Sequence, residues 1–312
     1  MAAGAIPGAW LLSRLGGCGK DPIPRFPISD RRRAGGTDVT FLVAADTHCG
    51  FRGIAPRNAR QVEAMNALAL RDWPWGGDGP VGQPRMVLIA GDLTENGEDS
   101  ELAEFLELYG TDGRDGRLRW PTRVCMGNHD RYVPSTYLGR KPVKQMVEQR
   151  NGGLFYSWDV DDVHFVCLGE YLTLDRQRWL AADLARAGAD VPVVLFFHYN
   201  ILGAYSDWWT DEEKSSLADV IEPFNVVAIF HGHWHTSRRD RWANTRTFNV
   251  GSPKHRMHSF SAVRITDETL AVASFNWDRN DWQWAHRQRI NRQSAADTSG
   301  RPRTARYASR PQ

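Results

Sequence analysis

The stretch Val39-Thr40-Phe41-Leu42-Val43-Ala44-Ala45-Asp46-Thr47-His48 (VTFLVAADTH) decides the fold of this chain. Its first seven residues are apolar or β-branched, which is typical of a strand buried inside a sheet. Asp46 and His48 follow at once, two positions apart. On extended backbone, alternate side chains point to the same side, so we expect this carboxylate and imidazole to converge on one site.

The same arrangement, an apolar strand closed by polar residues, recurs four times further along the chain. The later strands are expected at Met86–Ala90, Arg123–Met126, Val193–Phe197 and Val226–Phe230. The residues that close them are Gly91-Asp92, Gly127-Asn128-His129-Asp130, His198 and Gly232-His233-Trp234-His235, in that order. Ligands of α/β sheets bind at the carboxyl ends of the strands, so all these side chains are expected at one edge.

Helical patterns separate the early strands. The first helical pattern begins at Pro56, and the later ones cover Glu101–Leu108, Val143–Gln149, Asp175–Arg186 and Asp211–Ile221. Two more strands are expected at Leu154–Trp158 and His164–Leu168, and three short strands without a helix between Thr245 and Trp277. Alternating strands and helices followed by helix-free strands favour an α/β layered sandwich. A TIM barrel would keep a helix after every strand.

The 312 residues divide into one catalytic domain, residues 37–280, and two peripheral segments. Residues 1–36 hold a short apolar stretch, then Leu15-Gly16-Gly17-Cys18, which resembles a bacterial lipobox, and a Pro- and Arg-rich tether. They predict an exported bacterial lipoprotein anchored to the membrane through Cys18. A disordered extension of a cytoplasmic protein is the alternative. Residues 281–312 are polar and Arg-rich, and we expect a disordered tail.

Composition excludes several classes of protein. Lys and Arg number 39 against 37 Asp and Glu, and a net charge of +2 gives no general attraction for nucleic acid. The chain has no run of 18 apolar residues, which excludes a conventional internal membrane span. The cysteines Cys18, Cys49, Cys125 and Cys167 are too few and too scattered for a disulfide framework or a zinc ribbon.

The residue types at the predicted sheet edge are those of a two-metal site. Carboxylate and imidazole ligands suit Mn, Fe or Zn, whereas thiolates would favour softer metals. An Asp in the middle of such a set can bridge two ions about 3.5–4 Å apart, the separation used for phosphoryl displacement. Glycines beside Asp92, Asn128 and His233 permit the tight turns that present these side chains. Two divalent metal ions are therefore the expected cofactors.

The series Asp46-x-His48, Gly91-Asp92, Gly127-Asn128-His129-Asp130, His198 and Gly232-His233-x-His235 resembles the calcineurin-like metallophosphoesterase superfamily, over roughly residues 38–275. The resemblance implies a four-layer α/β/β/α sandwich with a dinuclear metal site at the edge of the central sheets. It assigns metal one to Asp46, His48, Asp92 and His235. It assigns metal two to Asp92, Asn128, His198 and His233, and it places His129 against the substrate without a bond to metal.

The same resemblance implies a metal-dependent hydrolase of phosphoesters. Two ions would activate a water as the attacking hydroxide, and His129 would donate a proton to the leaving alkoxide or hold the phosphate. Glu95 stands where purple acid phosphatases carry a Tyr, so a coloured iron–tyrosinate centre is not expected. The stretch Gly91–Gly97 resembles instead the bacterial class III branch of cyclic-nucleotide and glycerophosphodiester phosphodiesterases. A small-molecule phosphodiester is therefore the expected substrate.

Three other functions stay open at this point. A phosphomonoesterase acting on a small molecule or a phosphoinositide headgroup would use the same ligands. A nuclease is suggested by the arginines of residues 287–312, although these lie in the expected tail. A non-catalytic binding scaffold would have lost metal ligands, whereas every ligand position is filled here. The sequence leaves the oligomeric state open.

The loop Tyr199–Thr210 (YNILGAYSDWWT) is a candidate for contact with the substrate. Tyr205, Trp208 and Trp209 would form an aromatic rim that stacks a base or meets a lipid or sugar. The alternative is that the two tryptophans pack under the following helix. Arg131 would contact the substrate phosphate or, equally, form a structural ion pair.

Three further polar residues are expected to have structural roles. Asp130 is expected to cap a turn rather than to orient His129. His231 precedes the Gly-His-x-His motif and is expected to support it. His164 lies in an alternating strand, away from the motifs.

Overall fold

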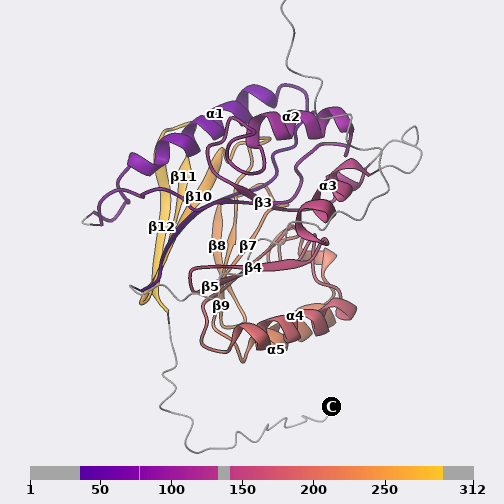
Figure 1. Cartoon of the computed structure of the whole chain (residues 1–312), viewed down its shortest axis with the longest axis vertical. Coiled ribbons are helices and arrows are strands. Elements are labelled where there is room, and N and C mark those ends of the chain that lie inside the picture. Colours follow the sequence, from indigo (N-terminus) through magenta and orange to yellow (C-terminus); the bar gives the residue numbers. More distant parts are fainter. Residues whose placement is uncertain (1–35, 77, 133–140, 291–312) are drawn as a thin grey trace, which may run out of the picture.

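The computed structural model describes residues 36–76, 78–132 and 141–290. These residues form two six-stranded sheets that face each other, with helices on the outer sides (Figure 1). This is the α/β/β/α sandwich that the sequence predicts. The predicted lipobox with Cys18 lies outside the described residues, as does the end of the predicted tail.

The first sheet has the strand order β12-β11-β10-β1-β2-β3. Its parallel part consists of β1 (Asp38–Ala44), β2 (Val87–Ala90) and β3 (Thr122–Cys125). Its antiparallel part consists of β10 (Ser259–Thr266), β11 (Thr269–Asn276) and β12 (Asp281–Arg289). The helices on this side are α1 (Ala55–Ala67), α2 (Asp99–Tyr109) and α3 (Pro142–Asn151). The apolar strands are buried on both faces because helices cover one and the second sheet the other.

The second sheet has the order β4-β5-β6-β7-β9-β8. Its strands are β4 (Tyr156–Val160), β5 (Val163–Cys167), β6 (Val193–Phe197), β7 (Val226–His231), β8 (Arg238–Trp242) and β9 (Thr245–Asn249). Helices α4 (Leu174–Ala187) and α5 (Asp211–Ile221) lie on the side away from α1 and α2 (Figure 1). Leu180 and Leu184, one helical turn apart on α4, are buried in the same cluster as Leu195 and Ile229 of the sheet.

The boundaries of α5 are those predicted, because local chemistry sets its start. Thr210 caps the helix by accepting a hydrogen bond from the backbone N–H of Glu213 (3.1 Å), and the Glu213 carboxylate accepts one from the N–H of Thr210 (2.9 Å). This reciprocal pair satisfies two of the backbone donors that a helix start leaves free.

Aromatic side chains hold the two sheets together. Phe41 of β1 meets Phe165 of β5 edge-on, with ring centroids 5.2 Å apart, and Phe230 of β7 at 6.1 Å. All three side chains are fully buried. Cys49, Cys125 and Cys167 are buried free thiols, so they are core residues. Among the helices of the described ranges, none has the length and apolar character needed to cross a membrane.

The predicted tail begins too early, since β12 occupies residues 281–289 and pairs with β11. A register shift between β11 and β12 at Ser274/Phe275 gives two tryptophans of β12 different neighbours: Trp282 stacks on Trp73 (6.1 Å), and Trp284 stacks on Phe248 of β9 in the second sheet (6.0 Å). The domain therefore extends at least to Ile290, which is buried. The strand β8 was also not predicted. Both are edge strands: β8 has a single apolar residue, Trp242, and β12 has exposed Asp281, Arg287 and Arg289, so neither shows a continuous apolar alternation.

Candidate metal centre

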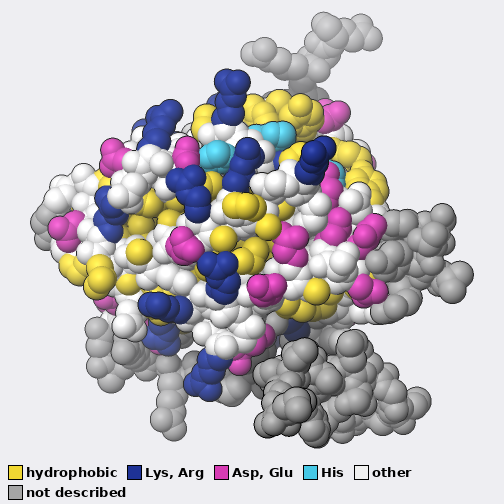
Figure 2. Space-filling view, turned by 90° about the horizontal axis from the view of Figure 1, so that it is seen from above, with side chains coloured by type: hydrophobic (Ala, Val, Ile, Leu, Met, Phe, Trp, Pro, Cys, Tyr) yellow, Lys and Arg dark blue, Asp and Glu magenta, His cyan; other side chains and the backbone are white. Residues whose placement is uncertain are grey.

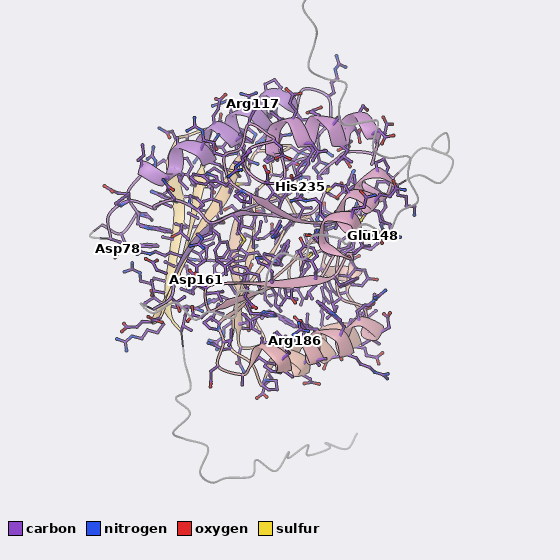
Figure 3. All side chains as sticks on the ribbon, viewed as in Figure 1. Asp78, Arg117, Glu148, Asp161, Arg186 and His235 are labelled. Atoms are coloured by element: carbon purple, nitrogen blue, oxygen red, sulfur yellow. The ribbon has the colours of Figure 1, made fainter. Side chains whose placement is uncertain are left out.

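The predicted ligands meet at the edge where β1, β2, β3, β6 and β7 end. The residues brought together are Asp46, His48, Asp92, Asn128, His198, His233 and His235. In the stick view His235 lies well inside the outline of the ribbon, whereas Asp78 and Arg186 lie at the periphery (Figure 3). Seen from above, histidine side chains reach the surface with Lys and Arg side chains beside them (Figure 2).

The first group of ligand atoms comes from both sheets. Asp46, His48, Asp92 and His235 each offer one atom within 4.8 Å of the others. His48 Nε2 lies 3.1 Å from His235 Nε2 and 3.6 Å from Asp92 Oδ2, and His235 Nε2 lies 3.5 Å from Asp46 Oδ1. Apart from His235, whose side chain is 13% exposed, these side chains are almost fully buried. Imidazole and carboxylate lone pairs that converge in a buried place are the donor set of a divalent ion.

The second group shares Asp92 with the first. His198 Nε2 lies 3.3 Å from Asp92 Oδ2, 3.0 Å from Asn128 Oδ1 and 3.2 Å from His233 Nδ1. Asp92, His198 and His233 satisfy the distances of a metal site by themselves, and Asn128 adds an oxygen. Because Asp92 belongs to both groups, it is placed to bridge two ions, as two-metal hydrolysis requires.

The backbone is strained at the ligands themselves. Asp46, His48, Asp92, His233 and His235 all have positive φ angles, between 44° and 68°. Non-glycine residues rarely adopt this left-handed region, and each costs of the order of 1 kcal/mol or more. Such strain gathers at functional sites, where binding of a ligand offsets it.

The glycines next to the ligands have two different roles. Gly91, with a φ of 82°, has the predicted role in a tight turn. Gly127 and Gly232 have no positive φ; they leave room for ligand side chains. A Cβ atom on Gly127 would collide with the Asp92 carboxylate, and one on Gly232 would lie 2.6 Å from Asp46 Oδ2. Gly127 and Gly232 are therefore needed for close approach.

The electrostatics of the centre favour a bound cation. Burial would lower the pKa of His198, but the carboxylates of Asp92 and Asp46 outweigh it and raise the pKa to about 10. Burial and the neighbouring His198 lower the pKa of His233 to about 4, so this imidazole is neutral at pH 7. The carboxylates thus attract positive charge to the centre, either as a proton or as a metal ion. Neutral imidazoles there can bind the metal ion through their lone pairs.

His129 lies beside the ligands without joining either of these two groups. Its backbone N–H donates to Asp92 Oδ1 (2.9 Å), and its Nδ1 lies 2.8 Å from the backbone oxygen of Glu95. A carbonyl oxygen can only accept, so Nδ1 carries a hydrogen and Nε2 is left to face outward. The side chain is 28% exposed, which suits a group that meets the substrate.

The three supporting residues have the structural contacts that the sequence suggested. Asp130 accepts hydrogen bonds from the N–H groups of Leu93, Thr94 and Gly127, so it caps the turns around the centre. His231 Nδ1 contacts Asn249 Nδ2 at 2.8 Å, and burial lowers its pKa to about 3. His164 lies between two carboxylates in the outer part of the second sheet.

Glu95 and Lys254 belong to the centre but were not predicted as site residues. Glu95 Oε2 lies 2.7 Å from His48 Nδ1, and Lys254 Nζ lies 2.8 Å and 3.0 Å from the two oxygens of Glu95. Burial would raise the pKa of Glu95, but the hydrogen bonds of His48 and Lys254 lower it to about 2. No motif marks Lys254, and its place in the centre depends on the return of the chain before β10.

Two of the three residues of the predicted aromatic rim are exposed beside the centre, and their contact with a substrate stays a prediction. Tyr205 is 61% exposed and Trp208 is 47% exposed, with ring centroids 6.0 Å and 6.3 Å from that of His233. Trp209 is wrong as a substrate contact, because it is buried and its indole N–H donates to the backbone oxygen of Tyr199. The single turn Ser206–Trp208 turns adjacent tryptophans to opposite sides.

Arg131 forms an ion pair, which is one of the two roles that the sequence predicts for it. Its guanidinium lies 2.9 Å from Glu170 and also donates to the hydroxyl of Tyr199 at 3.3 Å. Burial raises the pKa of the Glu170 carboxyl to about 7, and this effect outweighs the lowering by Arg131. The pair stands at the metal-two side of the centre.

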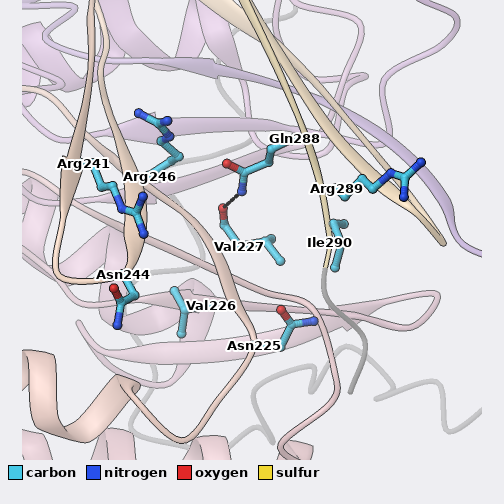
Figure 4. A pocket seen from close by; sticks show the side chains of 9 residues that line it. All are labelled: Asn225, Val226, Val227, Arg241, Asn244, Arg246, Gln288, Arg289 and Ile290. Atoms are coloured by element: carbon cyan, nitrogen blue, oxygen red, sulfur yellow. Dashed lines mark hydrogen bonds between the residues drawn. The ribbon is translucent and has the colours of Figure 1, made fainter. Parts of the chain in front are cut away.

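A separate pocket of about 250 Å³ lies far from these ligands (Figure 4). It lies between the β8–β9 hairpin and the end of β12, and Asn225, Val226 and Val227 at the start of β7 line it. The metal ligands follow the opposite end of β7, so this pocket does not belong to the centre. It is polar, and in the close-up the side chain of Arg289 points away from Val227.

Comparison with known proteins gives the family. The sequence profile of the calcineurin-like phosphoesterase family matches residues 39–237. Purple acid phosphatase 18 of Arabidopsis thaliana is 28% identical over 153 residues, which are 43% of this chain and 34% of that protein. The match thus spans about a third of the length of this curated relative.

Solved structures agree on the fold. The anchor protein GAP50 of the inner membrane complex of Plasmodium superposes with a TM-score of 0.61 at 10% identity, over 82% of this chain and 90% of that one. A dimetal phosphatase from Danio rerio superposes with a TM-score of 0.56 at 13% identity, over 81% and 99%. The profile match covers most of the domain, and the ligand geometry is that of a two-metal site, so the chain belongs to the calcineurin-like phosphoesterase family.

Proposed function

We propose that this phosphoester hydrolase acts on a small-molecule phosphodiester. The observation that carries the proposal is the charge around the metal ligands. Arg131 and Lys254, which flank the centre on its two sides, are each already paired with a carboxylate, Glu170 and Glu95. A monoester dianion would gain from free cations beside the metals, whereas a diester carries a single negative charge.

The exposed rings of Tyr205 and Trp208 supply what a second ester group needs. They stand beside His233, on the metal-two side, where a substituent on the phosphorus can lie against an aromatic face. A diester has such a substituent on both sides of the phosphorus. A monoester has one, and the other side would be left as a hydrated phosphate oxygen.

The protein's own residues divide the work of hydrolysis. When bound, the two ions supply water activation and neutralise charge on the phosphoryl oxygens. Asp46, His48, Asp92 and His235 would hold one ion, and the second group would hold the other. His129, held by contacts with Glu95 and Asp92, would donate a proton from Nε2 to the leaving alkoxide when its imidazole carries a hydrogen on both ring nitrogens.

The test is turnover of bis(p-nitrophenyl) phosphate against p-nitrophenyl phosphate by the protein loaded with Mn²⁺. We expect kcat/KM for the diester to exceed that for the monoester by at least about tenfold, which is about 1.4 kcal/mol in transition-state binding. A preference for the monoester would overturn the proposal. It would favour the second candidate, a phosphomonoesterase, which the names of the curated relatives support.

We also propose, from the sequence, membrane attachment through a lipid on Cys18. The motif Leu15-Gly16-Gly17-Cys18 after an apolar stretch supports it. Labelling with a radioactive fatty acid in a bacterial host should mark the wild-type chain and leave Cys18→Ala unlabelled. Equal labelling of both, or none, would leave the cytoplasmic alternative.

A further inference from the structure

His48 faces the metal centre with one ring nitrogen and a carboxylate with the other. Its Nε2 points to Asp92 and His235, at 3.6 Å and 3.1 Å. Its Nδ1 lies 2.7 Å from Oε2 of Glu95. An ionised carboxylate can only accept a hydrogen bond, so Nδ1 carries the hydrogen and Nε2 presents its lone pair to the centre.

Glu95 is itself held from the other side by Lys254. The ammonium lies within 3.0 Å of both carboxylate oxygens and 3.4 Å from His48 Nδ1. Lys254 is 11% exposed and rests on the ring of Phe51, 4.7 Å from its centroid. The backbone of Lys254 is also linked to the centre by hydrogen bonds. Its N–H donates to the hydroxyl oxygen of Ser252, and that hydroxyl donates to the backbone oxygen of Asp46.

The other imidazoles of the centre have weaker support at their outer nitrogens. His198 Nδ1 lies 2.9 Å from the backbone oxygen of Ala90, a neutral acceptor. His235 Nδ1 is buried and has no hydrogen-bond partner among the described residues. The nearest carboxylate oxygen to His198 Nδ1, on Asp46, is 3.9 Å away. His48 therefore differs from both in having a charged acceptor at hydrogen-bond distance, and Lys254 holds that acceptor.

Glu95 also lies close enough to His48 and His129 for the three to hold a cation. Lys254 already brings a positive charge to this place, at hydrogen-bond distance from both oxygens of Glu95. A metal ion there would have to displace the ammonium and compete for the nitrogen that donates to Glu95. The geometry therefore suits an outer carboxylate rather than a third metal site.

We propose that Glu95 and Lys254 are positioning residues for the metal-one site, acting through His48. Glu95 fixes which nitrogen of His48 carries the hydrogen and orients the ring, and Lys254 holds the Glu95 carboxylate in place through both of its oxygens. A carboxylate behind a ligating histidine typically changes metal affinity by about 10- to 100-fold. The inference uses the metal centre and does not depend on the preference for a diester.

The test measures metal binding without substrate, by titration calorimetry with Mn²⁺ and by metal content after dialysis. Glu95→Gln keeps the shape of the side chain but removes its charge, and Glu95→Ala removes both. We expect one of the two ions to bind about 10- to 100-fold more weakly in Glu95→Ala, less so in Glu95→Gln, and the other ion to bind as in the wild type. Wild-type affinity for both ions in Glu95→Ala would overturn the proposal.

The variants Lys254→Met and Lys254→Arg test whether Lys254 supports Glu95 or contacts the substrate. We expect Lys254→Met to weaken the same ion as Glu95→Ala, by less, and Lys254→Arg to restore most of the affinity. Arg131→Met is the matched control, since it breaks the ion pair on the metal-two side and should leave both affinities unchanged. A rise in KM for Lys254→Met with unchanged metal binding would make Lys254 a substrate contact and overturn its positioning role. Failure of the diester preference would not move any of these binding results.

Discussion

The two halves of the metal centre are built from different kinds of contact. Around metal one, His48, Glu95 and Lys254 form a chain of charged hydrogen bonds, with side chains at most 19% exposed. Around metal two, the ring of Tyr199 lies 4.7 Å from that of His233, and Trp208 stacks on Tyr199 at 4.7 Å. One half is ionic and enclosed, and the other is aromatic and open.

This difference indicates that one half of the centre fixes a metal ligand, whereas the other half contacts the substrate. Charged hydrogen bonds fix a ligating imidazole, but they use up the polar groups that could bind anything else. Exposed rings contribute little to metal binding and leave apolar surface for an ester substituent. The comparison therefore predicts that variants in the two halves fail in different ways, and the following changes test it.

Asp92→Ala breaks both halves and should have the largest effect. Asp92 is the ligand that the two groups share, at 3.6 Å from His48 and 3.3 Å from His198. We expect both ions to be lost and hydrolysis to fall to background. Metal analysis after dialysis and turnover of bis(p-nitrophenyl) phosphate check this. Retention of two ions would show that Asp92 is not the bridge.

His129→Ala should abolish chemistry while both halves keep their metals. His129 stands outside the two groups that share Asp92, and the side chain lost is a proton donor rather than a ligand. We expect turnover to drop by roughly 10²- to 10⁴-fold, the usual range for general acid–base catalysis, with metal content near that of the wild type. Full turnover would remove His129 from the mechanism.

Trp208→Ala tests the open half alone. Loss of an exposed ring that contacts the substrate should raise KM for an aryl diester by about tenfold, with both ions bound normally. Phe51→Ala is the matched change on the enclosed half, since Phe51 is 37% exposed there. It should leave this KM close to that of the wild type. Equal effects of the two variants would contradict the division between the halves.

The smallest effect on hydrolysis is expected at His164, away from both halves. Burial would lower its pKa, but hydrogen bonds with Asp159 and Asp183 raise it to about 9. The charged imidazole therefore stabilises the fold fully below about pH 6.5, and this stabilisation is lost as the pH rises through 9. A pKa shift of this size corresponds to about 3 kcal/mol.

Chemical denaturation at pH 6 and pH 9.5 would measure this loss for the wild type and for His164→Gln. The variant should be less stable at pH 6 and should show a smaller change between the two conditions. An equal fall in the free energy of unfolding for both proteins would assign the pH dependence to another group.

Strand positions and metal ligands were predictable because each signal is local. An apolar run followed by Asp46 and His48 carries both the strand and its chemistry within ten residues. The edge strands β8 and β12 were not predictable in this way, since many of their side chains are charged. Trp282 and Trp284 of β12 have their partners in distant segments, Trp73 and Phe248.

Contacts across the chain account for the remaining differences. Glu95 and Lys254 are 159 positions apart, and nothing in either local stretch marks them as a pair. Trp208 and Trp209 look alike in sequence, but a single helical turn exposes one and buries the other. The sequence predicts which residue types a metal centre needs, while packing decides which neighbours support them.

The left-handed backbone at five of the ligands makes the thermal stability of this protein a readout of metal supply. Bound ions offset the backbone strain at these ligands, and without metal that strain destabilises the folded chain. The loops around the centre should therefore open first when metal is scarce. Each tenfold rise in free metal above the dissociation constant adds about 1.4 kcal/mol per ion to the folded state. The melting temperature should therefore climb with the logarithm of metal concentration, even in a variant that hydrolyses nothing.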